Sequence, residues 1–234
     1  MQNKKPFKQP PKKFHPKGIT ILYEDWDILV VEKTAGLLTI SSAHVREQTA
    51  YYLLTDYVRK GNSKSKNRLF IVHRLDRDTS GLLIFAKTEK AKLFLQAEWS
   101  TFEKKYYAVV QGVLEKKEAV LSNYLAENTA HKMYLVGDPK KGKLAKTEYR
   151  VCKESTKYSL LEIKLLTGRK NQIRVQFAAT GHPVAGDKKY GERQKGVKRL
   201  CLHSFSLRLI HPFSKEEMSF TSKRPTYFDS LLRH

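Results

Sequence analysis

Residues 73–83 read HRLDRDTSGLL, and they join a cluster of charged side chains to the start of an apolar run. Asp76 stands between Arg74 and Arg77, and a turn-forming DTSG segment follows. A carboxylate flanked by guanidinium groups stays ionised and can face an anionic polymer. In other settings an aspartate in a turn mostly serves as a hydrogen-bonding residue. The apolar run predicts a strand over 81–87, with Asp76 shortly before it.

The composition indicates a folded protein with a polyanionic partner. The chain has 234 residues, of which 40% are hydrophobic and 11% aromatic, enough for a substantial core. It carries 45 Lys and Arg residues against 23 Asp and Glu, a net charge of +22. This excess favours nucleic acid first and an anionic membrane surface second. No apolar run reaches the length of a bilayer span and no signal segment is apparent, so we expect a cytoplasmic protein. Cys152 and Cys201 lie far apart in the sequence, which predicts two reduced cysteines.

Periodicity and turn residues predict an α+β protein. Residues 1–18 hold six lysines, no acid and four prolines, which predicts a basic, disordered tail. Helices are predicted over about 46–60 and 171–180, after Thr88 and after Pro225, and a mobile basic loop over 60–68. Strands are predicted over residues 19–23, 27–33, 81–87, 104–112, 118–125, 132–137, 144–152, 158–166 and 200–210. Many successive strands with few helices between them favour one domain over 19–234, built on a mixed, mostly antiparallel β-sheet flanked by helices and loops.

Five stretches of sequence resemble motifs of the RluA-type RNA pseudouridine synthases, in the same order. Residues 73–83 are similar to the family's catalytic motif, His-Arg-Leu-Asp, two variable residues and Thr-Ser-Gly-Leu-Leu. Residues 104–112, KKYYAVVQG, resemble its Lys-x-Tyr-x-Ala-x-Val-x-Gly strand. Residues 165–175, LLTGRKNQIRV, resemble its Leu-x-Thr-Gly-Arg-(Thr-His)-Gln-Ile-Arg motif. Residues 181–191 and 199–203 are similar to a family loop and strand that we interpret as architectural.

The sequence departs from these motifs at two places. Lys170 and Asn171 replace the family's Thr-His pair, and Thr34 replaces the proline of a Lys-Pro-x-Gly-Leu turn. The resemblance still spans about residues 19–212 and implies a pseudouridine synthase fold. Because the predicted tail is short, we expect a single catalytic domain without the separate N-terminal RNA-binding domain of some family members.

The resemblance assigns roles to individual residues. It implies that Asp76 is the catalytic carboxylate, that Arg174 pairs with it and that Tyr106 lies against the uracil ring. Alternation along the strand places Tyr106 and Tyr107 on opposite faces, so only one of them can point to the site. Arg74 is expected to fill the space left by a flipped base. Further RNA contacts are expected from His73, Arg77, Lys104, Arg169 and Lys170, and from basic loops near 60–68, 140–146 and 188–199.

The implied activity is the isomerisation of uridine to pseudouridine in a structured RNA, such as an rRNA or tRNA stem-loop. No cofactor and no metal are expected, because the histidines and cysteines form no ligand cluster in the sequence and no phosphate-binding glycine motif occurs. We expect a monomer without an obligatory protein partner or membrane attachment. The alternative is an inactive RNA-binding or RNA-folding module on the same scaffold, against which the intact Asp76, Tyr106 and Arg174 argue. A DNA-binding protein is disfavoured, since no helix-turn-helix or basic zipper pattern is present.

Overall fold

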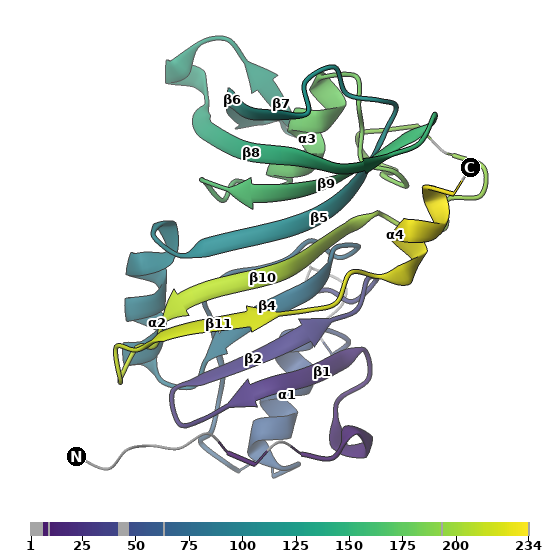
Figure 1. Cartoon of the computed structure of the whole chain (residues 1–234). Coiled ribbons are helices and arrows are strands. Elements are labelled where there is room, and N and C mark those ends of the chain that lie inside the picture. The colour runs from purple at the N-terminus through teal and green to yellow at the C-terminus, as the bar shows by residue number, and fades with distance from the viewer. Residues whose placement is uncertain (1–6, 9, 42–46, 63, 193, 234) are drawn as a thin grey trace. The chain divides into compact units, whose positions relative to one another are not determined.

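The chain forms two compact units in the computed structural model (Figure 1). The structure describes residues 7–8, 10–41, 47–62, 64–192 and 194–233. The first unit holds residues 1–102 and 208–222, and the second holds residues 103–207 and 223–234. Each unit has its own strands, helices and buried core.

The first unit is built on antiparallel strands. The pairs are β1 (Ile19–Glu24) with β2 (Ile28–Lys33), β2 with β4 (Ser80–Ala86), and β3 (Phe70–Ile71) with β4. A further strand, β11 (Glu217–Thr221), pairs with β10 (Leu202–Ile210), whose residues from Arg208 onward belong to this unit. Every residue of β4 is buried, so this strand lies at the centre of the unit's core.

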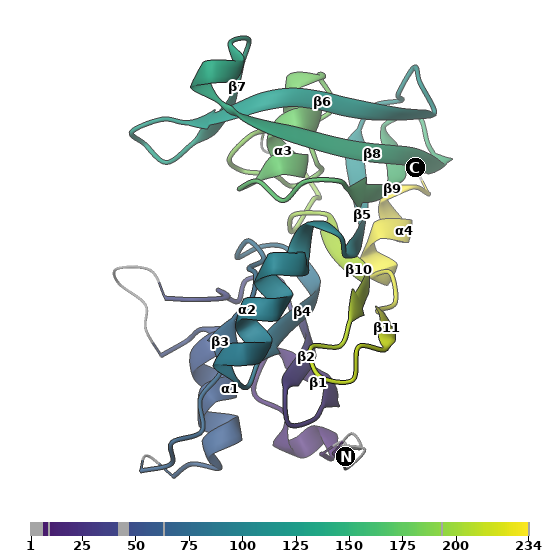
Figure 2. The same ribbon diagram turned by 90° about the vertical axis from the view of Figure 1, so that its left-hand side faces the viewer.

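Two helices, α1 (Ala50–Arg59) and α2 (Glu89–Ala97), lie on the same face of these strands (Figure 2). Both begin at a threonine whose hydroxyl caps the first turn. Thr49 accepts a hydrogen bond from the N–H of Tyr52 at 3.2 Å, and Thr88 accepts one from the N–H of Ala91 at 3.1 Å. Helix α1 ends at Lys60, which adopts a left-handed conformation with φ of 54°.

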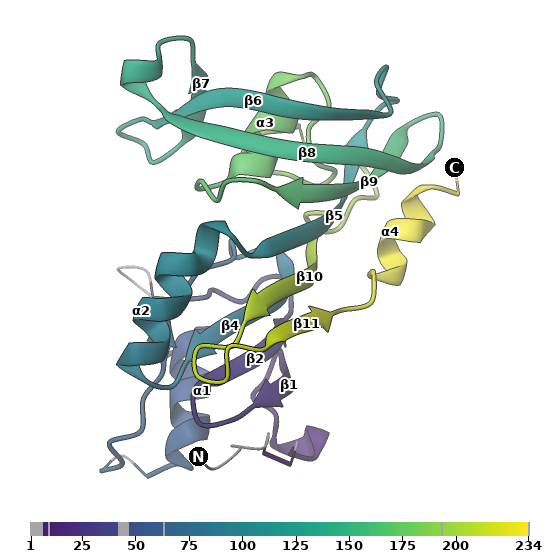
Figure 3. The same ribbon diagram turned by 60° about the vertical axis from the view of Figure 1, so that its left-hand side comes forward.

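The second unit is an antiparallel sheet covered by one helix. Its strands are β5 (Glu103–Gln111), β6 (Glu118–Glu127), β7 (Met133–Val136), β8 (Lys143–Glu154) and β9 (Tyr158–Leu165). They pair in the order β5-β9-β8-β6-β7, and the β10 residues up to Leu207 lie next to β5. Helix α3 (Gln172–Ala179) packs on β6, β7 and β8 (Figure 3), where Val175 joins Leu125, Met133 and Ala145 in a buried cluster. A short helix, α4 (Thr226–Leu231), is also part of this unit.

The predicted α+β class with a mostly antiparallel sheet is confirmed. The first helix was predicted to start at about residue 46, but it starts at Ala50, because Thr49 caps it. Residues 42–46 lie outside the described residues. Two strands were not predicted. β3 is only two residues long, and β11 alternates exposed and half-buried side chains without a strong apolar signal.

The described residues of the expected N-terminal tail differ from an unstructured segment. Lys12–Phe14 form a single 3₁₀ turn, and a nitrogen of the His15 ring lies 3.0 Å from the carbonyl oxygen of Pro10. Phe7 packs edge-on against Trp26 at a ring distance of 5.1 Å and donates its N–H to the Glu24 carbonyl. Aromatic packing and backbone hydrogen bonds therefore hold this lysine-rich, proline-rich stretch to the first unit.

A transmembrane helix is not found among the described residues, since none of their helices is both long and apolar enough.

Candidate active site

Asp76 lies in the irregular segment that leads from β3 into β4. Its side chain is partly exposed, and its carbonyl oxygen accepts a hydrogen bond from the N–H of Thr79 at 3.2 Å, which closes the turn. Thr79 and Ser80 are buried at the start of β4. The turn predicted after Asp76 is therefore present, and the strand begins at Ser80, one residue earlier than predicted.

Residues 33–39, which we call the clamp segment, hold the residue that follows Asp76. The ammonium group of Lys33, a residue with 0% exposure, donates to the carbonyl oxygens of Thr34 (2.9 Å), Leu37 (2.8 Å) and Arg77 (3.1 Å). The Arg77 carbonyl also accepts the N–H of Gly36 at 2.9 Å, and the Arg77 Nε–H donates to the Gly36 carbonyl at 3.1 Å. Lys33 thus satisfies its buried charge with backbone oxygens and ties two segments together.

The clamp segment also holds the residue that precedes Asp76. The hydroxyl group of Thr39 donates to the carbonyl oxygen of Leu75 at 2.8 Å and accepts the N–H of the same residue at 3.2 Å. Both Thr39 and Leu75 are buried. Asp76 is consequently fixed through the backbone on both sides. The sequence interpretation placed Lys33 at the end of a strand and in a family-like turn; a lysine at the end of a strand that begins with four apolar residues was the available signal for more.

The other charged residues of the 73–83 block have separate surroundings. The His73 ring stacks on Trp99 with centroids 4.2 Å apart and planes 26° apart, and its Nε2 accepts the N–H of Ile84 at 3.3 Å. Arg74 and Arg77 are exposed, and Arg77 is oriented by its bonds to Gly36. Arg74 is therefore accessible to a large ligand, as its expected role requires.

In the second unit, β5 presents Lys104 and Tyr106 on its buried face. Tyr107 lies on the opposite face, where its ring stacks on Phe205 at 3.8 Å, so the expected alternation of the two tyrosines is confirmed. Burial disfavours the charged form of Lys104 and lowers its pKa to about 8. Lys104 can therefore lose or gain a proton near neutral pH.

Arg174, on α3, forms a buried ion pair with Asp187. Its Nε and Nη2 groups donate to the two carboxylate oxygens at 2.7 and 2.8 Å, a bidentate geometry. The side chains of Arg174 and Asp187 are 9% and 0% exposed. Oδ1 of Asp187 also accepts the N–H groups of Lys189 and Tyr190. Burial alone would raise the pKa of Asp187, but the hydrogen bonds and charge of Arg174 outweigh it and lower that pKa.

This ion pair changes our interpretation of residues 181–191, which the sequence indicated to be purely architectural. Asp187 fixes the guanidinium group that the family motif singles out. Gly186 makes the loop possible: its φ is 75°, and a Cβ there would lie 2.1 Å from the carbonyl oxygen of Arg199. A glycine followed by an acid in a motif-like loop was the signal for Asp187.

The departure from the family motif at Lys170–Asn171 lies in the turn before α3. Asn171 adopts φ of 52°, a left-handed conformation that asparagine tolerates better than most residues, and it accepts the hydroxyl of Tyr190 at 2.9 Å. Lys170 is ion-paired with Glu127 at the end of β6. The Arg169 Nε–H donates to the carbonyl of Leu144 at 3.0 Å. Arg169 and Lys170 are both exposed, at the surface of the second unit.

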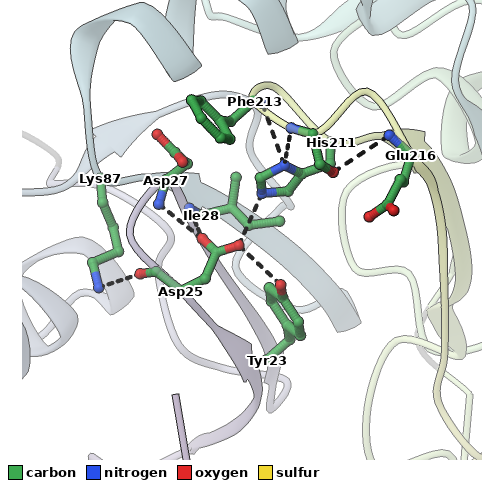
Figure 4. A network of polar contacts seen from close by, with 9 residues as sticks. Tyr23, Asp25, Asp27, Ile28, Lys87, His211, Phe213 and Glu216 are labelled. Carbon is green, nitrogen blue, oxygen red and sulfur yellow. Dashed lines mark hydrogen bonds and ion pairs between the residues drawn. The ribbon is translucent and has the colours of Figure 1, made fainter. Parts of the chain in front are cut away.

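A group of possible metal ligands lies elsewhere in the first unit. Asp25, Asp27 and His211 place one ligand atom each within 4.8 Å of one another (Figure 4). Both oxygens of Asp25, however, already accept hydrogen bonds, from the N–H groups of Asp27 and Ile28, the Tyr23 hydroxyl and Nε2 of His211. Nδ1 of His211 accepts backbone N–H groups of Phe213 and Ser214. We interpret the group as a structural link between the β1–β2 turn and the turn before β11.

The structure thus groups the predicted site residues in two sets. His73, Arg74, Asp76 and Arg77 belong to the first unit, and Lys104, Tyr106, Arg169, Lys170 and Arg174 belong to the second. The expected pairing of Arg174 with Asp76 stays a prediction.

Comparison with known proteins identifies the family of the chain. Residues 27–179 match the family model of RNA pseudouridylate synthases. The chain is 36% identical over 228 residues to an uncharacterized RNA pseudouridine synthase of Aquifex aeolicus, with 91% of this chain and 72% of the relative covered. It is 34% identical over 226 residues to ribosomal large subunit pseudouridine synthase D of Nitrosomonas europaea, with 92% of this chain and 64% of the relative covered. The human protein RNA Pseudouridylate Synthase Domain Containing 4 has a similar fold, with a TM-score of 0.75 at 22% identity and 91% of each chain covered.

The chain therefore belongs to the RNA pseudouridylate synthase family, as its sequence motifs predicted. It is an isomerase that converts uridine to pseudouridine in RNA.

Proposed function

We propose that Asp76 is the catalytic carboxylate of this isomerase. The observation that carries the proposal is the two-sided hold of the clamp segment on Leu75 and Arg77, the residues next to Asp76. Because the backbone at Asp76 is already fixed, little conformational entropy is lost when the substrate binds, and this favours catalysis. Asp76 is also partly exposed, so RNA can reach it.

The reaction requires an anionic group at the sugar. The bond between ribose C1′ and uracil N1 breaks, the base turns, and a C1′–C5 bond forms; C5 loses its proton and N1 gains one. Positive charge develops at C1′ as the first bond breaks, and an ionised carboxylate stabilises it. Attack on C1′ and removal of a sugar proton both need Asp76 in this ionised form. No redox step or external nucleophile takes part.

Arg174 and Tyr106 complete the proposed catalytic set. Arg174 orients Asp76 and keeps it ionised, since an opposite charge within a few ångströms lowers a carboxyl pKa by about 1–3 units. Its own orientation is fixed by the bidentate pair with Asp187. Tyr106, on the buried face of β5, stacks against the uracil ring.

The exposed basic residues then hold and open the RNA. A uridine in a stem must leave the base stack before it can react, at a cost of roughly a few kcal/mol. Arg74 fills the vacated space, because its planar guanidinium group can stack on bases and contact phosphate. His73, Arg77, Lys104, Arg169 and Lys170 contribute the surrounding RNA contacts.

The proposed substrate is a structured RNA, an rRNA or tRNA stem-loop, and the name of the Nitrosomonas europaea relative favours large-subunit rRNA. The test is to map pseudouridines in total rRNA and tRNA of a strain that lacks the gene, complemented with the parent or with Asp76→Asn. One or more sites should disappear on deletion and return only with the parent. Return of the same sites with Asp76→Asn would contradict the role of Asp76. A cytoplasmic monomer without an obligatory protein partner remains our expectation.

A further inference from the structure

A groove of about 580 Å³ lies in the second unit, and its lining includes Arg169 and Lys170, two of the residues proposed to contact RNA. Its lining residues come from the end of β6, the start of β7, the 3₁₀ turn Pro139–Lys141, the start of β8 and the turn before α3. Its charged lining residues are Lys140, Lys141, Lys143, Arg169, Lys170 and Glu127, five cations and one acid. All six side chains are exposed, so the charges face solvent and not the core.

The corner that carries three of these lysines is held in place. Asp138 caps the 3₁₀ turn Pro139–Lys141 by accepting the N–H of Lys140 at 2.9 Å. Gly142 lets the corner approach β7, because a Cβ there would lie 2.5 Å from a methyl carbon of Val136. The lysines are consequently presented from a fixed backbone, opposite the Arg169 whose Nε–H is bonded to the Leu144 carbonyl.

Glu127 is the only acidic residue among the described residues that line the groove, and it contacts two basic side chains. One of its carboxylate oxygens accepts hydrogen bonds from the ammonium group of Lys170 and from Nδ1 of His131, the latter at 3.0 Å. The bond from Lys170 lowers the pKa of Glu127 below its ordinary value, so the side chain is ionised at neutral pH. An anion is thus already bound between two basic side chains of the protein itself.

We propose that this groove binds the phosphodiester backbone of the RNA substrate, with a phosphate taking the place of the Glu127 carboxylate at Lys170. The inference rests on the proposed function only in that RNA is the substrate. The five cations and one acid of the lining favour a polyanionic ligand. The volume of the groove lies within the range of about 300–1,000 Å³ that is usual for ligand pockets. Glu127 competes with the phosphate, so it limits the affinity of this surface for RNA.

This competition predicts opposite effects from two kinds of substitution. Glu127→Gln removes the internal anion and frees Lys170 for phosphate, which should tighten binding and steepen the dependence of log affinity on log salt by about 0.7. The double substitution Lys140→Glu/Lys141→Glu should weaken binding by about tenfold or more and make that slope shallower by about 1–2. A merely structural role for these exposed residues would not produce effects of opposite sign.

The experiment measures RNA affinity at a series of salt concentrations, using an RNA stem-loop as the probe. All groove variants are made in the Asp76→Asn background, so that binding is measured without turnover. Glu115→Gln and the double substitution Lys116→Glu/Lys157→Glu serve as controls with the same charge changes, because these residues are exposed in other loops of the same unit. Turnover of Asp76→Asn itself is measured separately, so a failure of the catalytic assignment remains distinguishable from a failure of the groove.

Tighter binding by Glu127→Gln together with weaker binding by the double lysine variant, each beyond its control, would support the proposal. Equal affinities and salt slopes for the groove variants and their controls would overturn it, and the RNA would then follow another surface. Weaker binding by Glu127→Gln would equally overturn it, because the carboxylate would then be part of the RNA contact and not a competitor.

Discussion

Asp187 and Lys33 are buried charged residues whose partners come from elsewhere in the fold. The family motif predicted Arg174 from sequence, but not Asp187, because the pair joins α3 to a loop that only the tertiary structure brings close. Lys33 was predicted as part of a turn, yet its ammonium group bonds to three backbone carbonyls. A sequence motif can predict which residues carry the charges, whereas the partners of buried charges depend on the tertiary packing.

Breaking the Arg174–Asp187 pair should lower both stability and activity. Removal of one partner from a buried pair costs about 3–5 kcal/mol, since it leaves an uncompensated charge. We therefore expect Asp187→Asn and Arg174→Ala to lower the midpoint of thermal unfolding, with a much smaller change for Arg150→Ala, whose pair with Glu162 is exposed.

The double variant Arg174→Met/Asp187→Leu separates the two effects. Replacing a buried pair by apolar residues of similar volume is often neutral for stability. The double variant should therefore unfold at a higher temperature than either single variant and still lack activity. Full activity in Asp187→Asn, at an unchanged unfolding midpoint, would show that Asp187 does not position Arg174.

At the scale of elements, a local capping signal placed α2, whereas the cap of α1 and the long-range links were not predicted. Thr49 and Thr88 cap α1 and α2, and the second helix could be placed from its threonine and the acid that follows. The clamp segment and the link between the β1–β2 turn and the turn before β11 join segments far apart in the chain. Such hydrogen bonds have no periodic sequence signal.

The clamp segment should matter more for turnover than for RNA affinity. Thr39→Val keeps the shape of the side chain but leaves the N–H and carbonyl groups of Leu75 without their partner, at a cost of about 1–3 kcal/mol. We expect kcat to fall while the Kd for RNA stays close to that of the parent. Thr34→Val is the control, because the Thr34 hydroxyl is exposed and bonds only to the Gly18 carbonyl among the contacts described. Equal kcat values in the two variants would mean that Thr39 does not position Asp76.

The link at Asp25 should stabilise the protein in a pH-dependent way. Burial alone would raise the pKa of Asp25, but hydrogen bonds from His211, two backbone N–H groups and Tyr23 outweigh it and lower that pKa. A carboxyl whose pKa is lower in the folded state stabilises above its unfolded pKa of about 3.9, and this contribution is lost as the pH falls through the folded pKa.

Asp25→Asn should therefore unfold at a lower temperature than the parent at pH 7, and the difference should narrow as the pH falls below about 4. Thermal unfolding of both proteins across this range measures it, with Asp27→Asn as the neighbouring control. A difference that stays constant with pH would show that the ionised carboxylate is not what stabilises the link.

At the scale of the whole molecule, composition and motif order predicted the class of partner and the family. The net charge of +22 indicated a polyanion, and the family match over 27–179 identifies RNA. Most strands were predicted because their apolar residues alternate or run continuously. The division into two units was not predicted, since it depends on residues 208–222 returning to the first unit late in the chain. Tertiary pairing of strands decides which late segment joins the first unit, and the local sequence carries no pattern that predicts it.

Release of tritium from RNA labelled at uracil C5 measures directly whether Asp76 carries the isomerisation. The C5 hydrogen is lost only when the new C1′–C5 bond is completed, so RNA binding alone releases none. The parent should release tritium in step with pseudouridine formation, and Asp76→Asn should be slower by at least about a hundredfold while binding RNA within a few fold of the parent. Release by Asp76→Asn within about tenfold of the parent rate would contradict the account.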